Sequence, residues 1–281
     1  MKRTFFSLSM MVVLLSLYSC STSTETPIDA VDTDARVDQV SEVEPEPIIL
    51  WKPALEIFSY IDGTVDRRIE YEYDDTGRIL KSLESDGRGN IVEIREYDYD
   101  GENLIGRRNF DEGGLVSRTE FVLNSQGLAV KEINRDAEEQ IRSMISYEYD
   151  NGKIVRSVAL NASEVPQLQS DYSYEGKMLS SVEYSLPGGN LEARFERTFQ
   201  NTRVIEEKTY LPDGSVETGK RFEYDGNFLI GEIYFSGNSK SKSVDFQLDD
   251  QGNIVRETWR NRNDRIFEVV DRTWLSFEID G

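Results

Sequence analysis

The sequence of 281 residues contains no histidine and a single cysteine, Cys20. Without histidine the chain cannot form the serine–histidine or cysteine–histidine pairs that activate many nucleophiles, and it has no imidazole ligand for a metal ion. One cysteine also excludes a disulfide within the chain. The sequence therefore predicts a protein that is not an enzyme and that carries no cofactor.

Basic residues are also few. Lys and Arg number 32 against 53 Asp and Glu, which gives a formal net charge of -21. A chain this acidic repels phosphate backbones and anionic lipid head groups, so we expect no nucleic acid partner. Such charge keeps a large sheet soluble. A basic protein, a basic peptide or a metal ion stays open as a cationic partner.

Only one long apolar run is present, from Phe5 to Leu17. It is shorter than the roughly 20 residues that span a bilayer as a helix, and Lys2 and Arg3 precede it, as in a secretory signal peptide. The run ends in Leu17-Tyr18-Ser19-Cys20, which resembles the lipobox of bacterial lipoproteins, with Tyr18 in place of the usual small residue. The resemblance implies a signal peptide over residues 1–19 and a membrane anchor through lipid on Cys20.

Residues 20–50 are rich in Ser and Thr and then in acidic side chains, and Pro45 and Pro47 end the stretch. Low hydrophobicity, charge of one sign and proline are typical of a disordered, self-repelling tether. Ser21 is not the aspartate that retains lipoproteins at the inner membrane of enteric-type bacteria. The lipoprotein resemblance therefore implies an outer-membrane location, on either the periplasmic or the surface face.

A motif of about 25 residues recurs through the remainder of the chain. Its clearest copy reads Tyr71-Glu-Tyr73-Asp74, followed by Gly77. We take the second apolar residue of each copy as its anchor, and the eight anchors lie 24 to 26 residues apart, at Tyr73, Tyr99, Leu123, Tyr149, Tyr174, Phe199, Tyr224 and Leu248. A ninth, degenerate copy is expected at Trp274 or at Phe277.

Each copy predicts two strands and two turns. Tyr71 and Tyr73 alternate with Glu70 and Glu72, which is the period of a strand with one buried face. Asp-x-x-Gly favours a turn, because Asp bonds backbone amides ahead of it and Gly accepts a positive φ. A second turn signal lies midway between anchors, for example Asp86-Gly87.

The predicted fold over residues 51–281 is all-β, an extended antiparallel meander of about 18 strands of seven or eight residues. Open sheets of more than about ten strands tend to curl or split, so we expect a coiled or rolled sheet, or two layers. A membrane barrel is disfavoured, because its strands need about ten residues with apolar side chains toward lipid, whereas these strands are shorter and carry a charged face.

The Tyr-x-Tyr-Asp-x-x-Gly-Arg-Ile/Leu pattern, clearest in the copy from Tyr73 to Leu80, resembles the YD repeat of RHS proteins over residues 56–281. Residues 210–234, with Gly214, Gly219 and Gly226, also resemble a MORN-type repeat. Both families build β-hairpin arrays, so both resemblances imply the same kind of architecture. Neither implies a substrate, because fold does not determine function.

The repeat also governs where a binding site is expected. Acidic residues recur as turn Asp and outward strand Glu, which favours structural roles over calcium ligation or a glycosidase pair. The recurring tyrosines are expected in the core. The residues that we expect to break the repeat, and therefore to bind, are Arg135, Trp259, Arg260 and Arg262.

The sequence thus predicts a membrane-anchored envelope lipoprotein whose repeat domain is a non-catalytic scaffold for a protein or glycan partner. Two alternatives stay open. One is a purely structural spacer or assembly factor, and the other is a carboxylate-dependent glycosidase.

Overall fold

The computed structural model describes residues 48–279. Cys20, the expected signal peptide (1–19) and the expected tether up to residue 47 lie outside this range. The strands are β1 (Ile48–Ser59), β2 (Val65–Tyr73), β3 (Ile79–Asp86), β4 (Ile91–Asp100), β5 (Asn103–Asp111), β6 (Gly114–Leu123), β7 (Ala129–Asp136), β8 (Ile141–Asp150), β9 (Lys153–Asn161), β10 (Pro166–Glu175), β11 (Met178–Ser185), β12 (Leu191–Gln200), β13 (Arg203–Tyr210), β14 (Val216–Asp225), β15 (Phe228–Ser236), β16 (Ser239–Leu248), β17 (Ile254–Asn261) and β18 (Ile266–Ile279).

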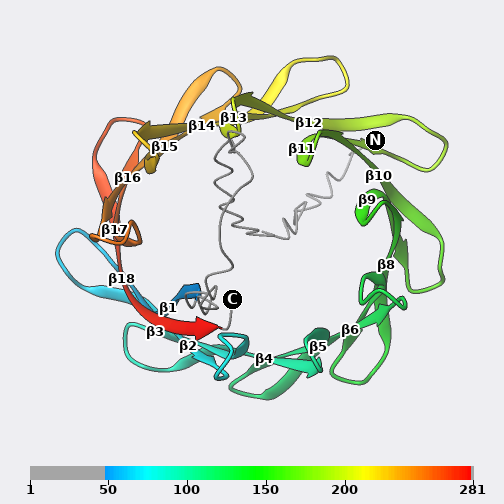
Figure 1. The fold of residues 1–281 in the computed structure, drawn as a ribbon, viewed down its shortest axis with the longest axis horizontal. Helices are drawn as coiled ribbons and strands as arrows, with labels where there is room; N and C mark the ends of the chain where they lie inside the picture. The colour runs from blue at the N-terminus through cyan, green and yellow to red at the C-terminus, as the bar shows by residue number, and fades with distance from the viewer. Residues whose placement is uncertain (1–47, 280–281) are drawn as a thin grey trace, which may run out of the picture. The chain divides into compact units, whose positions relative to one another are not determined.

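The eighteen strands form one antiparallel sheet that closes on itself. Each strand pairs with its neighbours in the chain, and β1 pairs with both β2 and β18. Figure 1 shows the resulting ring of hairpins. The all-β meander is thus confirmed, and the rolled sheet is a closed barrel rather than an open coil or two layers. Closure removes the exposed strand edges that an open sheet would present.

The anchor marks a β-bulge in each copy of the repeat. The pairing register shifts directly before the anchor, for instance between Glu72 and Tyr73, between Asp98 and Tyr99, and between Glu148 and Tyr149. The ninth shift lies opposite Trp274, between Pro53 and Leu55. Bulges bend a strand and increase its twist, so one recurring residue introduces a bend once in each repeat, and the strand pairs between these have bulges of their own, for instance between Glu84 and Ser85.

The register keeps the same side chains on one side around the whole barrel. We call the side that carries Tyr71 and Tyr73 the inner face, and the side that carries Glu70 and Glu72 the outer face. Cross-strand partners such as Tyr71 and Ser82 share a face. Side chains converge on the concave side of a closed sheet, and most of the buried ones belong to the inner face, including Val182, Ala193, Val244, Val270 and Thr119.

The turns are held by Asp and Asn side chains, as predicted. Asp74 Oδ1 accepts the backbone N–H groups of Thr76 at 3.0 Å and Arg78 at 2.9 Å, and Gly77 has a φ of +78°. The same bonds to residues two and four positions ahead recur at Asp86, Asn124, Asp136, Asn161, Asp249 and Asn261.

Two expectations need correction. Strands run from eight to fourteen residues rather than seven or eight, because each continues through its bulge. The anchor tyrosines are only half-buried, and the largest fully buried side chains are Met144, Val244 and Val270. A barrel of 16 to 18 strands is too wide for side chains from opposite walls to meet. The tyrosines therefore lie against their own wall instead of forming a packed core.

The anchor side chains bond to that wall in a repeated way. The hydroxyls of Tyr73, Tyr149, Tyr174 and Tyr224 donate to the backbone carbonyl 20 residues earlier, at 2.8 to 3.0 Å. Trp274 Nε1 donates to the carbonyl of Ile254 at 3.0 Å, again 20 residues earlier. Trp274, not Phe277, is therefore the ninth anchor.

Candidate functional site

Five glutamates form a belt on the inner face, one strand away from the tyrosines. They recur at one place in the repeat, at Glu56, Glu132, Glu207, Glu232 and Glu257. We predicted that strand glutamates point outward, and for these five the prediction is wrong. Their pairing explains why, since Glu132 lies opposite Phe121 and Glu257 opposite Phe246, both inner-face residues.

Each of these carboxylates accepts a hydrogen bond from a neighbouring side chain. Tyr71 donates to Glu56 at 2.9 Å, and Tyr147 donates to Glu132 at 3.1 Å. Burial, and then the adjacent negative charge, raises the pKa of both tyrosine hydroxyls. The remaining donors in the belt are Arg197 to Glu207, Tyr234 to Glu232 and Trp259 to Glu257.

One part of the glutamate belt lies where the first strand of the barrel, β1, pairs with the last strand, β18. Arg272 on β18 contacts Glu56 on β1, and its second nitrogen lies 2.6 Å from Glu257 on β17. Burial by itself would lower the pKa of Arg272, but hydrogen bonds and charge from the two glutamates raise it. This arginine therefore carries a fixed positive charge between two buried carboxylates at the closing seam.

Two lysines gather over aromatic rings on the inner face of β14 to β17. Lys242 Nζ lies 4.3 Å from the ring centre of Trp259 and 4.7 Å from that of Tyr234. Lys220 Nζ lies 5.1 Å from the Tyr234 ring and 3.3 Å from Glu232. The Tyr234 and Trp259 ring centres are 5.6 Å apart. We call Lys220, Tyr234, Lys242 and Trp259 the lysine–aromatic cluster.

A cavity of about 370 Å³ opens beside this cluster. Its lining comes from β12 to β16 and consists of Phe195, Glu207, Lys208, Thr209, Thr218, Gly219, Lys220, Tyr234, Phe235, Ser236, Ser241 and Lys242. Two-thirds of these side chains belong to the inner face by their register. The cavity thus combines an aromatic ring, cationic groups and several hydroxyls.

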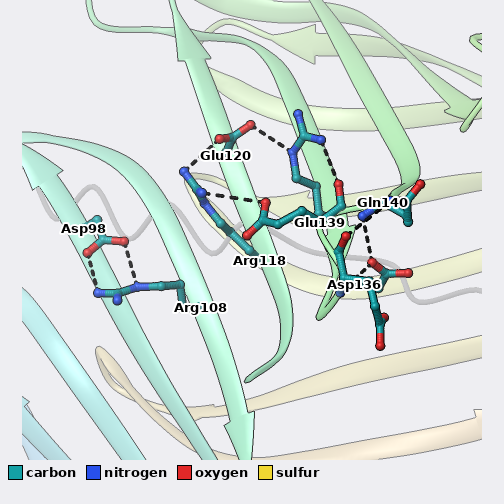
Figure 2. Close-up of polar contacts among 9 residues, drawn as sticks. Asp98, Arg108, Arg118, Glu120, Asp136, Glu139 and Gln140 are labelled. Carbon is teal, nitrogen blue, oxygen red and sulfur yellow. Dashed lines mark hydrogen bonds and ion pairs between the residues drawn. The ribbon is translucent and has the colours of Figure 1, made fainter. Parts of the chain in front are cut away.

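The outer face is covered by ion pairs. Figure 2 shows Arg108 beside Asp98, at 2.9 Å, and Arg118 beside Glu120, at 2.8 Å. In Figure 2 the opposite wall of the barrel lies behind the sheet that carries these residues. Exposed pairs of this kind contribute about 0–1 kcal/mol each. They make the outer face hydrophilic rather than contribute much to stability.

The four predicted binding residues do not meet on one surface. Arg135 and Arg260 lie on the outer face and Trp259 on the inner face, and Arg262 is exposed in the turn after β17. Arg135 and Arg260 make equivalent contacts in their two copies of the repeat. Arg135 pairs with Glu120 and bonds the carbonyl of Glu139, and Arg260 pairs with Asp245 and bonds the carbonyl of Asp264.

The equivalence of Arg135 and Arg260 follows from their spacing in the sequence. Arg135 and Arg260 are five repeats apart, so they fill one structural position whose other occupants, such as Phe235, are not basic. Comparison of neighbouring copies therefore makes each arginine look exceptional. Lys220 and Lys242 were missed, although their even spacing from the anchors Tyr224 and Leu248 already predicts the inner face.

Between residues 48 and 279, no group of three or more His, Cys, Asp or Glu side chains could hold a metal ion. Over the same residues there is no helix long and apolar enough to cross a membrane.

No family model matches the chain, and no curated protein matches it. Among solved structures it is similar to a porin-like protein from Bacteroides uniformis, with 10% identity and a TM-score of 0.44 over 79% of this chain and 96% of that one. A porin-like protein from Bacteroides vulgatus gives 12% identity and a TM-score of 0.38 over 79% of this chain and 98% of the other. Neither likeness assigns a function to this chain.

Proposed function

We propose that the protein is a lipid-anchored lipoprotein of the bacterial envelope, placed at the outer membrane, whose barrel is a non-catalytic binding scaffold for a protein or glycan partner. A closed antiparallel barrel is consistent with an envelope location. The proposed anchor is Cys20, which follows the apolar run in the sequence. The RHS and MORN resemblances stay proposals about architecture and assign no partner.

The charge of the outer face supports a barrel that stands in water on its tether. Seven strands have ten residues, which is the length that we expected only of membrane barrels. The side-chain pattern nevertheless argues against lipid contact, because ion pairs such as Arg156–Asp171 and Arg108–Asp98 lie along the outer face. Lipid-facing arginine costs about 2–4 kcal/mol at the bilayer midplane.

The observation that carries the binding role is a set of aromatic side chains on the inner face. It consists of the aromatic anchors together with Tyr71, Tyr97, Phe121, Tyr147, Tyr172, Phe222 and Phe246, and these side chains are half-buried. Partly exposed aromatic rings are suited to stacking on sugars or to packing against a protein segment.

The glycosidase alternative is less well supported. Glycoside hydrolysis needs one carboxyl free to donate a proton and a second free to act on the sugar or on water. The belt glutamates instead accept bonds from Tyr71, Tyr147, Arg197, Tyr234 and Trp259. The bonds from Tyr71 and Tyr147 occupy equivalent places in the repeat, as do those from Tyr234 and Trp259, which favours a structural role.

The anchor is tested by detergent partitioning of the full chain expressed in a bacterial host. We expect the wild type to enter the detergent phase, Cys20→Ser to leave it, and the control Ser23→Ala to behave as the wild type. A Cys20→Ser protein that partitions like the wild type would contradict the anchor.

The binding role is tested in two ways. The purified lipidated protein, in detergent, is applied to a glycan array, and the protein expressed in cells is cross-linked to its neighbours. We expect a partner whose binding is lost in Phe121→Ser/Phe246→Ser, on the inner face, and retained in Val122→Ser, the adjacent outer-face control. Binding to nothing would favour the spacer or assembly factor. Cleavage of an arrayed glycan would favour the glycosidase.

A further inference from the structure

We infer that the cavity beside the lysine–aromatic cluster binds an acidic sugar, a pyranose unit that carries a carboxylate. The inference deepens the proposed function, because it rests on the barrel being a binding scaffold and names one site and one ligand class on it. It is carried by Lys242, by the ring of Tyr234 and by the hydroxyls of the cavity.

Lys242 is a cation without a carboxylate partner among the described residues. Its nitrogen is paired only with the rings of Tyr234 and Trp259. Many other Lys and Arg side chains of the barrel pair with Asp or Glu, and Lys220 in the same cluster contacts Glu232 at 3.3 Å. In a chain with 53 acidic residues, a partly buried lysine whose charge faces only aromatic rings can still bind an anion.

The ring of Tyr234 indicates what the ligand carries beside its anionic group. Tyr234 lines the cavity between Lys220 and Lys242, so an anion on Lys242 lies next to an aromatic face. A sugar ring presents a C–H face that packs on an aromatic side chain, while a free inorganic anion has nothing to place there. The combination therefore fits a ring-shaped anion better than a simple ion.

The remaining lining fits the hydroxyl groups of a sugar. Thr209, Thr218, Ser236 and Ser241 bring hydroxyls to the cavity, and Glu207 brings a carboxylate that can accept a bond from a sugar O–H. A volume of about 370 Å³ lies at the lower end of small-molecule sites, which run from about 300 to 1,000 Å³. The cavity is thus suited to one or two sugar units of a longer glycan.

The inference is tested by calorimetric titration of the full-length lipidated protein in detergent. The probes are trigalacturonate, the neutral trisaccharide maltotriose and inorganic sulfate. We expect trigalacturonate to bind, and both maltotriose and sulfate to bind at least tenfold more weakly. Lys242→Met keeps the apolar stem over the rings and removes the charge, and we expect it to weaken trigalacturonate binding at least tenfold.

Lys153→Met is the matched control, because Lys153 also lies over a tyrosine ring, at 5.0 Å from that of Tyr174, but outside the cavity. We expect it to bind trigalacturonate as the wild type does. Circular dichroism of each variant checks that the barrel is folded. Equal binding by Lys242→Met, by maltotriose or by sulfate would overturn the acidic-sugar site.

The two proposals fail in different ways. Absence of trigalacturonate binding, together with partner binding that depends on Phe121 and Phe246, would remove the acidic-sugar site and leave the scaffold. Absence of both would remove both.

Discussion

At the scale of single residues, the anchor tyrosine has two separable roles. The hydroxyl of Tyr149 donates to the carbonyl of Ala129 at 2.8 Å, and its half-buried ring covers the wall of the barrel. A hydrogen bond of this kind contributes about 0.5–1.5 kcal/mol. A fully buried ring costs about 3–5 kcal/mol on truncation to alanine, so a half-buried one should cost less.

We therefore expect Tyr149→Phe to lower the free energy of unfolding by about 1 kcal/mol and Tyr149→Ala to lower it by about 2–3 kcal/mol. Urea unfolding followed by circular dichroism measures both. If Tyr149→Ala retained the full wild-type stability, the ring would have no role in the scaffold and would be better explained as part of a binding face.

Asp74 gives the fold a dependence on acid. Burial would raise the pKa of its carboxyl, but hydrogen bonds from the N–H of Arg78 and from Thr76 lower the pKa to about 2. The folded-state pKa thus lies below the unfolded value of about 3.9. The charged carboxylate stabilises the fold fully above pH ~4, and this contribution is lost as the pH falls toward 2.

We expect Asp74→Asn to lower the melting temperature at pH 7, because the amide can keep the two backbone bonds that Asn124 makes in an equivalent turn but loses the charge and the ion pair with Arg78. The variant should lose less stability than the wild type between pH 4 and pH 2. Melting curves across this range measure the difference. Parallel pH profiles for the two proteins would show that Asp74 does not contribute to the acid dependence.

At the scale of the hairpin, local chemistry predicts most of what is observed. The anchors, the Asp-x-x-Gly turns and the number of strands follow from alternation and turn residues, which act within a few positions of the chain. The inward direction of Glu132 and Glu257 does not follow in this way. Their face is decided by pairing across a bulge, and although the anchor lies at the bulge, the motif alone does not show that the partner strand is shifted by one residue there.

Comparing two turn glycines, Gly77 and Gly152, distinguishes the cost of backbone strain from the cost of steric crowding. Gly77 and Gly152 have φ values of +78° and +77°, but only at Gly77 would an added Cβ meet a side chain, Phe277, at 3.2 Å. An alanine at positive φ costs about 1–2 kcal/mol. We expect Gly152→Ala to cost about that much and Gly77→Ala to cost more, in urea unfolding. Equal losses of stability in the two variants would mean that Phe277 does not pack against the turn at Gly77.

At the scale of the whole barrel, closure depends on the contact between the first and last strands. The motif predicts a rolled sheet but cannot predict closure, because β1 and β18 are more than 200 residues apart and their pairing has no local signal. The lysine–aromatic cluster likewise cannot be predicted from one hairpin. Its members come from four strands, and only the register of the sheet places them together.

Arg272 should be the most sensitive charged residue at the seam. Replacing it with methionine leaves Glu56 and Glu257 without its charge, and removing one partner of a buried ion pair costs about 3–5 kcal/mol. The control Arg156→Met removes an exposed outer-face pair with Asp171 and should cost less than about 1 kcal/mol. Urea unfolding compares the two. Similar small losses would mean that the seam does not depend on Arg272.

The most direct test of the closed barrel is a disulfide across the seam. Ile57 on β1 and Asp271 on β18 are cross-strand partners on the outer face. In a Cys20→Ser background, we expect Ile57→Cys/Asp271→Cys to form an intramolecular disulfide on mild oxidation, seen as a faster band on a non-reducing gel. Ile57→Cys/Asp171→Cys, which joins β1 to the distant β10, should form none. A closed barrel predicts that difference, and a folded protein in which the first pair does not cross-link would contradict it.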